Sequence, residues 1–147
     1  MRRCGTRAWS RATSNSRRWT SGWGDARLGS MKTLAVHHVS INVDDVDRAV
    51  RFYTDVLGLS RRADRPELGV EGAWLDAGAQ QVHLIHAEPP PGRGQHFALL
   101  VDDLDLVVAE LRSGGVRVSD PSPVGGSRQA FLNDPAGNLI ELHQAGS

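Results

Sequence analysis

HVSINVDDVD at residues 38–47 and HFALLVDDLD at residues 96–105 are two versions of one pattern, separated by a shift of 58 residues. In each version a histidine opens a short, mostly apolar run that ends in two aspartates. The same shift places VHL at 82–84 on IEL at 140–142, so one offset aligns both the beginning and the end of each unit. Two matches in one register indicate a duplicated supersecondary unit.

Both units show the same order of hydrophobic periodicities, which predicts a strand, a helix and then three strands. Alternation with period two is typical of strands, and a period of 3.6 is typical of helices. Asp44 or Asp45 is expected to cap the first helix through its carboxylate. The predicted strands lie at about 36–43, 59–64, 71–77 and 80–87 in the first unit and at about 95–101, 116–119, 128–133 and 138–143 in the second, with helices at about 46–57 and 103–113.

The predicted fold class is therefore α+β, with two tandem βαβββ modules. Module one is expected at about 34–87 and module two at about 95–144. Between them, EPPPG at 88–92 cannot continue a sheet and predicts a linker, because proline lacks the backbone N–H that a ladder needs.

Residues 1–30 have no hydrophobic periodicity and carry seven arginines and a single acid. We interpret them as a disordered leader, or as sequence ahead of a true start at Met31. A targeting sequence or a partner-binding arm is the alternative. The folded domain is expected over residues 31–147.

The composition of that domain excludes several classes of binding partner. Residues 31–147 hold ten basic and 16 acidic side chains, a net charge of −6, which argues against binding nucleic acid. No run approaches the roughly 20 apolar residues that span a bilayer, so we expect no membrane partner. Cys4 is the only cysteine, which rules out a disulfide within one chain and is compatible with the cytoplasm, the location we expect.

Four side chains at repeat-equivalent positions are the candidates for a metal site: His38, His83, His96 and Glu141. Strand alternation sends His38 to the face opposite the helix, because its apolar neighbours must pack against that helix. A charge within apolar strands is costly to bury unless it is paired or bound to a cation. Three imidazoles and a carboxylate suit a divalent transition metal, such as Zn, Ni, Mn, Co or Fe. If the two units face each other, we expect these donors to meet in one cleft.

Other side chains near these positions receive lesser roles. Trp74 and Phe131 are expected in the core, and Arg128 and Gln129 are candidates for lining the cleft. Three further histidines are expected on other faces, as surface or packing residues: His37, His86 and His143.

Three stretches resemble a known family: HHVSINVDDVDRAVRFYTDVLGL at 37–59, GQHFALLVDDLD at 94–105 and FLNDPAGNLIELHQ at 131–144. They are similar to the opening strand and helix, the second opening strand and the closing hairpin of the vicinal oxygen chelate superfamily. That superfamily includes glyoxalase I, methylmalonyl-CoA epimerase, extradiol dioxygenases, and fosfomycin- and bleomycin-resistance proteins. The resemblance covers about residues 34–144.

The resemblance implies paired modules that form a curved mixed sheet around a metal cleft, commonly completed by a homodimer. His38, His96 and Glu141 match ligand positions of the family, and Glu141 is the residue we expect to shuttle a proton. His83 matches a position that is glutamate in bacterial-type glyoxalase I and glutamine in the epimerase. Extradiol dioxygenases do not use that position as a ligand.

The leading functional prediction is a metal-dependent, glyoxalase-I-like lyase or isomerase that acts on a small oxygenated substrate. An Fe(II)-dependent extradiol-type dioxygenase is an alternative, because His38, His96 and Glu141 alone would form a two-histidine, one-carboxylate triad. The other alternative is a non-catalytic resistance protein that binds a drug or metabolite.

Overall fold

The computed structural model describes residues 34–92 and 94–146. The predicted leader, residues 1–30, lies outside the described residues. Ala35–Ser147 form one compact unit, which contains both repeats. No helix in the described ranges is long and apolar enough to cross a membrane.

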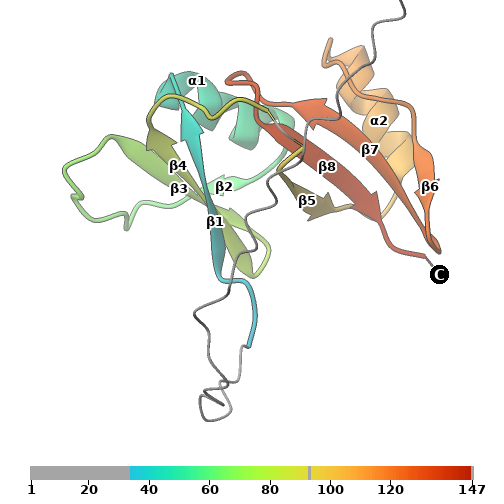
Figure 1. Ribbon diagram of the computed structural model, residues 1–147, viewed down its shortest axis with the longest axis horizontal. Coiled ribbons are helices and arrows are strands. Elements are labelled where there is room, and N and C mark those ends of the chain that lie inside the picture. The colour runs from blue at the N-terminus through green and yellow to red at the C-terminus, as the bar shows by residue number, and fades with distance from the viewer. Residues whose placement is uncertain (1–33, 93, 147) are drawn as a thin grey trace, which may run out of the picture. The chain divides into compact units, whose positions relative to one another are not determined.

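Module one forms a mixed four-stranded sheet in the order β1-β4-β3-β2 (Figure 1). The edge strand β1 runs parallel to β4, whereas β3 runs antiparallel to both β4 and β2. A short helix, α1, follows β1 and continues directly into a π-helical segment, η1. The bounds are β1 His38–Val43, α1 Val46–Arg51, η1 Phe52–Val56, β2 Ser60–Arg61, β3 Gly72–Ala77 and β4 Gln80–His86.

Module two repeats this plan with a sheet in the order β5-β8-β7-β6. The edge strand β5 runs parallel to β8, and β7 runs antiparallel to β8 and β6. The bounds are β5 His96–Leu100, α2 Leu104–Ser113, β6 Ser122–Val124, β7 Ser127–Asn133 and β8 Leu139–Gln144. The prediction of two tandem βαβββ modules is confirmed.

The register of the parallel pairs reproduces the sequence repeat residue by residue. Ser40 pairs with His83 in module one, and Ala98 pairs with Glu141 in module two. Ala98 lies 58 positions after Ser40, and Glu141 lies 58 positions after His83, the same shift that relates the two sequence motifs. The duplication therefore extends from the sequence to the hydrogen-bonded ladder.

Both helices begin at the second aspartate of the repeated motif. The Asp45 carboxylate accepts from the backbone N–H of Arg48 at 2.8 Å, and that of Asp103 accepts from Leu106 at 3.0 Å. These bonds satisfy donors that the first helical turn leaves free. Of the two predicted cap residues in module one, Asp45 is the one that caps.

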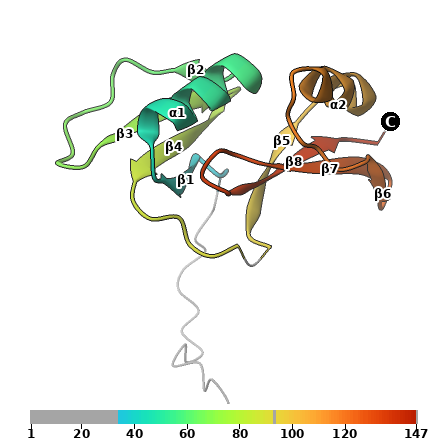
Figure 2. The same ribbon diagram turned by 90° about the horizontal axis from the view of Figure 1, so that it is seen from above.

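Each module buries its core between its helix and one face of its sheet. α1 packs against β3 and β4, and α2 packs against β7 and β8 (Figure 2). The inward positions alternate with outward ones along each strand, as pleating requires. The largest fully buried side chains are Tyr53, Leu75, Leu84, Leu104, Ile140 and Leu142.

The turn between β7 and β8 fastens the two modules to each other. Tyr53 of module one donates its hydroxyl hydrogen to the Asp134 carboxylate at 3.0 Å, and both residues are buried. Asp134 also accepts from the backbone N–H groups of Ala136 and Asn138, which closes the turn. The Asn138 amide then donates to the Asn42 carbonyl at the end of β1. We call Tyr53, Asp134, Asn138 and Asn42 the intermodule clasp.

The predicted strand at 116–119 is wrong. In that stretch Val118 makes only an isolated bridge to Leu132. The strand that pairs with the outer edge of β7 is β6, which contains Pro123. A proline is tolerated there because β6 is an edge strand. Backbone N–H groups on its outer side face solvent and need no partner in the sheet, so a residue without an N–H costs little.

Candidate functional site

The first half of the site lies on the face of the module one sheet that α1 does not cover. His38 on β1 pairs with Gln81 on β4, and Ser40 pairs with His83, so all four side chains share that face. The His38 and His83 rings stack, with centroids 4.1 Å apart and planes 14° from parallel. His38 is exposed, whereas His83 is only 9% exposed.

Trp74 forms the wall of this half-site. It pairs with His83 across β3 and β4, and the two rings stack at 4.5 Å with planes 11° apart. The expectation that Trp74 lies in the core is therefore wrong. Its strand neighbours Ala73 and Leu75 take the two core positions, and alternation sends Trp74 to the opposite face.

The surroundings of His83 favour its neutral form over its charged form. Its Nε2 lies 2.8 Å from the Gln81 Oε1, which accepts the Nε2 proton and leaves Nδ1 with the free lone pair. Burial first, and then the nearby basic side chains, lower the pKa of His83. A neutral imidazole with one free nitrogen is the form that binds metal.

The second half of the site lies on the equivalent face of module two. His96 Nε2 is 2.9 Å from Glu141 Oε2, and His96 Nδ1 is 2.8 Å from the Gly94 carbonyl oxygen. The bond to Gly94 first, and then Glu141, raise the pKa of His96 despite an opposing effect of burial. The Glu141 side chain is only 11% exposed. Phe131 meets the His96 ring edge to face at 5.5 Å, so its expected place in the core is also wrong.

His143 is a site residue that sequence reasoning missed. Its Nδ1 lies 2.8 Å from Glu141 Oε1, so Glu141 is bonded to an imidazole through each of its oxygens. The assignment of His143 to another face was wrong, because residues two apart on a strand share a face. That spacing was the signal that would have found it.

Of the other residues predicted near the site, some lie on the site face and some lie elsewhere. Gln129 pairs with His143 across β7 and β8, so it lies on the site face as expected. Arg128 does not line a cleft, because it binds Asp105 of α2 at 2.6 and 2.8 Å on the opposite side. His86 lies at the surface beside Glu71, and His37 is exposed but contacts His38.

The four predicted ligands thus form two pairs, His38 with His83 and His96 with Glu141. Among the residues that the structure describes, no three His, Cys, Asp or Glu side chains are grouped so that they could hold one ion. The prediction that all four share a single ion stays a prediction.

The pairs fit a metal ion in their chemistry and, in module two, in their spacing. In octahedral coordination, two neighbouring ligand atoms on bonds of about 2.1 Å lie roughly 3 Å apart. The His96 and Glu141 donor atoms, 2.9 Å apart, have this spacing. The His38 and His83 rings are nearly parallel and stacked, so an ion cannot lie in the planes of both, and one ring must tilt before both bind the same ion.

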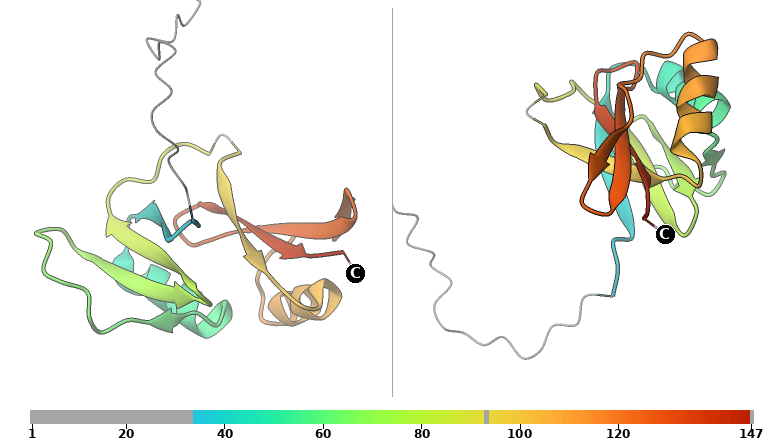
Figure 3. Two further views of the ribbon diagram at one scale, coloured as in Figure 1. Left: turned by 90° about the horizontal axis from the view of Figure 1, so that it is seen from below. Right: turned by 90° about the vertical axis from the view of Figure 1, so that its right-hand side faces the viewer.

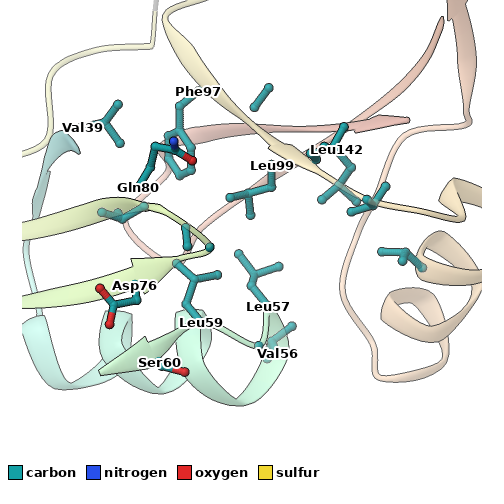
Figure 4. Close-up of a pocket in the computed structure, with 18 of the residues that line it drawn as sticks. Val39, Val56, Leu57, Leu59, Ser60, Asp76, Gln80, Phe97, Leu99 and Leu142 are labelled. Carbon is teal, nitrogen blue, oxygen red and sulfur yellow. The ribbon is translucent and has the colours of Figure 1, made fainter. Parts of the chain in front are cut away.

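Two cavities each touch one part of the site, and neither is lined by His83 or Glu141. The larger, about 1330 Å³, has His38 and Gln81 in its lining together with apolar side chains of both modules, among them Leu57, Leu59 and Leu99 (Figure 4). The smaller, about 400 Å³, includes His96 in its lining. The larger exceeds the roughly 300–1,000 Å³ of typical small-molecule pockets.

Comparisons with known proteins agree with this fold. The model of the Glyoxalase/Bleomycin resistance protein/Dioxygenase superfamily matches residues 35–142. A probable chloroplastic lactoylglutathione lyase from Arabidopsis thaliana is 34% identical over 74% of this chain, which spans only 35% of that protein. A probable lactoylglutathione lyase from Vibrio cholerae is 30% identical over 78% of this chain and 93% of its own length. Mitochondrial methylmalonyl-CoA epimerase from Mus musculus is 31% identical over 75% of this chain and 72% of its own length.

Two solved structures have the same fold. A glyoxalase family protein from Bacillus anthracis superposes with a TM-score of 0.72 at 24% identity, over 78% of this chain and 98% of its own. An antibiotic binding protein from a Streptomyces species superposes with a TM-score of 0.69 at 30% identity, over 80% of this chain and 100% of its own. The vicinal oxygen chelate resemblance of the sequence motifs is thereby confirmed, and the chain belongs to the glyoxalase/bleomycin resistance protein/dioxygenase superfamily.

Proposed function

We propose that this protein is a metal-dependent lyase or isomerase of the glyoxalase kind, which removes a proton next to a carbonyl group of a small oxygenated substrate. One observation carries the proposal: a nearly buried carboxylate, Glu141, lies 2.9 Å from His96 on the open face of the sheet. The relatives named lactoylglutathione lyase and methylmalonyl-CoA epimerase support this reaction class.

The proposed metal ligands are His38, His83, His96 and Glu141. Nitrogen and carboxylate donors suit Zn, Ni, Mn, Co or Fe, and hardly suit calcium. When bound, the ion would supply a Lewis acid that polarises a carbonyl oxygen.

Glu141 is the proposed proton shuttle. Its low exposure keeps bulk water from competing for the proton, and its carboxylate is on the face where a substrate would lie. Trp74 and Phe131 flank the two half-sites and would exclude water from the faces of the neighbouring imidazoles.

We further propose that a homodimer completes the site, with His38 and His83 of one chain facing His96 and Glu141 of another. The separation of the donors into two pairs supports this arrangement. β1 and β5, which carry His38 and His96, are edge strands of their sheets (Figure 3).

Metal analysis of the full-length protein tests the proposal. We expect about one divalent transition metal per pair of half-sites, and loss of that metal in His96→Ala. His86→Ala is the matched control, because His86 is a surface histidine outside the site. Protein that cannot be loaded with Zn²⁺, Ni²⁺, Mn²⁺, Co²⁺ or Fe²⁺ would refute the enzyme proposal.

Substrate assays then separate the reaction classes. Turnover of the methylglyoxal–glutathione hemithioacetal would support lyase activity, and racemisation of a 2-methyl-branched acyl thioester would support epimerase activity. Oxygen consumption with catechols would instead support the dioxygenase alternative.

A non-catalytic binding protein is the second candidate. The Streptomyces antibiotic binding protein supports it, with 30% identity over the full length of that chain. The apolar lining of the 1330 Å³ cavity would suit a large, partly apolar ligand. Tight binding of such a compound by metal-free protein, with no turnover of either substrate class, would favour this candidate.

A further inference from the structure

Glu141 is the only proposed ligand whose two donor atoms are both occupied by other side chains. Its Oε2 faces His96 Nε2 at 2.9 Å, and its Oε1 faces His143 Nδ1 at 2.8 Å. His143 follows Glu141 by two positions on β8, so both side chains project from the same face. The His143 side chain is about one third exposed and the Glu141 side chain is 11% exposed, so the contact lies at the rim of the half-site.

We propose that His143 is the positioning residue for Glu141, an inference that rests on the proposed function. The His143 Nδ1–H donates to Oε1 and fixes the carboxylate plane, so that Oε2 stays directed toward His96, the other proposed ligand of module two. A glutamate side chain has three rotatable bonds, and a single bond to His96 does not determine the orientation of its carboxylate. Partners of this kind, which orient a ligand without touching the metal, tune affinity and reactivity.

The sequence repeat distinguishes this role from that of a scaffold residue. Residues that build the duplicated fold recur after the 58-residue shift, as the core positions Val82 and Ile140 do. The counterpart of His143 in module one is Ile85, which cannot donate a hydrogen bond. His143 is therefore specific to the half-site that contains the carboxylate.

Module one also has a residue that orients a proposed ligand, but it lies before that ligand on the strand rather than after it. His83 is bonded to Gln81, two residues before it on β4, whereas the counterpart of Gln81 in module two is Leu139. Each last strand thus carries one polar residue, two positions from its ligand and on the same face. The Gln81 amide oxygen accepts a hydrogen bond from the His83 imidazole, and the His143 imidazole donates one to the Glu141 carboxylate. Each partner has the hydrogen-bonding group that its ligand requires.

Three variants of the full-length protein test the inference by metal affinity. His143→Ala removes the donor. His143→Asn keeps one, because the Asn amide nitrogen lies near the place of the imidazole Nδ1. His86→Ala removes a surface histidine as the control. Competition with a chromophoric chelator measures Zn²⁺ affinity, and the visible absorption of the Co²⁺ form reports the geometry of the ligands.

We expect His143→Ala to weaken Zn²⁺ binding by about 10–100-fold and to change the Co²⁺ spectrum. His143→Asn should restore most of the affinity, and His86→Ala should behave as wild type. If a substrate is turned over, His143→Ala should lower kcat more than it raises KM, because the proton acceptor is misaligned.

The possible failures are distinguishable. Wild-type protein that binds no ion would overturn the proposed function and this role together. Wild-type protein that binds an ion with the same affinity and spectrum as His143→Ala would overturn the positioning role alone. Nitrogen-15 NMR of the histidine rings gives a separate check, since a His143 found as the Nε2–H tautomer would not donate to Glu141 and would also overturn the inference.

Discussion

Gly72 lies on β3 directly against the backbone of β4, and no side chain fits at this position. A methyl group on Gly72 would overlap the carbonyl oxygen of Leu84 and press on the Arg65 guanidinium. The backbone oxygen cannot yield without disturbing the β3–β4 ladder. Trp74, two residues further on, depends on that ladder for its stacking against His83.

We expect Gly72→Ala to lower the free energy of unfolding by about 1–3 kcal/mol, because an extra methyl group in a filled space forces the backbone apart. Urea denaturation measures the change. Gly126→Ala is the matched control, since a methyl group there meets open space and should be neutral or stabilising by at most about 1 kcal/mol. Equal stability of the two variants would contradict the close approach.

Alternation along strands was enough to place the predicted ligands on one face of each sheet. The same rule applied to residues two apart would have brought in His143 and Gln81, whose contacts with Glu141 and His83 the structure reveals. Trp74 was misplaced because a large aromatic side chain was assumed to be buried. The pairing of the donors was beyond prediction, since it depends on the separation of the two sheets rather than on spacing along the chain.

At the scale of elements, α2 is attached to β7 by a bidentate ion pair. Arg128 donates to both oxygens of Asp105 at 2.6 and 2.8 Å. The hydrogen bonds from Arg128, and then its charge, hold the pKa of Asp105 below its usual value. Arg128 was a candidate for lining the cleft because it lies next to Gln129 at the start of the predicted strand, but it lies on β7 and strand alternation turns it toward α2.

Replacing Arg128 with Gln should raise the pKa of Asp105 toward the usual aspartate value of about 3.9. A carboxyl whose folded-state pKa is lowered stabilises the fold above that usual value, and the contribution is lost as the pH falls through the lowered one. Carbon-13 NMR of the carboxyl group follows the titration. Arg112→Gln is the control, because Arg112 pairs with Asp120 instead, and an unchanged Asp105 titration in Arg128→Gln would contradict the pairing.

Element prediction succeeded where the periodicity was long and failed where the strands were short. The two helices and the strands β1, β3, β4, β5, β7 and β8 lie close to their predicted ranges. β2 is two residues long, and β6 is three residues long and contains a proline. Such strands exist because a neighbouring strand pairs with them, and their own sequence carries almost no periodic signal.

At the scale of the whole molecule, the intermodule clasp joins the strands that carry the proposed ligands. Asn138 precedes β8, which carries Glu141, and it binds the carbonyl of Asn42 on β1, which carries His38. Asp134 stays buried because four donors reach its two oxygens, including the Tyr53 hydroxyl. The clasp therefore links stability to the geometry of the site.

We expect Tyr53→Phe to destabilise the protein by about 1.5–3 kcal/mol, the usual value of a hydrogen bond to a charged group. The substitution keeps the ring, so packing is preserved and the loss reports the bond. Asp134→Asn should cost more, because an amide group cannot accept from all four donors. Thermal unfolding of both variants and of the double variant measures the coupling, and strictly additive losses would contradict the contact.

The division of the donors into two pairs makes a further prediction about the assembly. If each metal site takes His38 and His83 from one chain and His96 and Glu141 from another, a lesion in either half destroys both sites of a homodimer. A mixed dimer of two differently damaged chains instead combines both lesions in one site and leaves the other intact. Sites built within one chain would show no such recovery.

We therefore expect His38→Ala and Glu141→Gln proteins, each unable to bind metal tightly, to regain binding when they are unfolded and refolded together. Random pairing makes half of the dimers mixed, each with one intact site, so metal content should reach about a quarter of the wild-type value. Mixing His96→Ala with Glu141→Gln is the control, because both lesions fall in the same half and no intact site can form. Recovery in both mixtures, or in neither although wild-type protein refolds with its metal, would contradict a site shared between two chains.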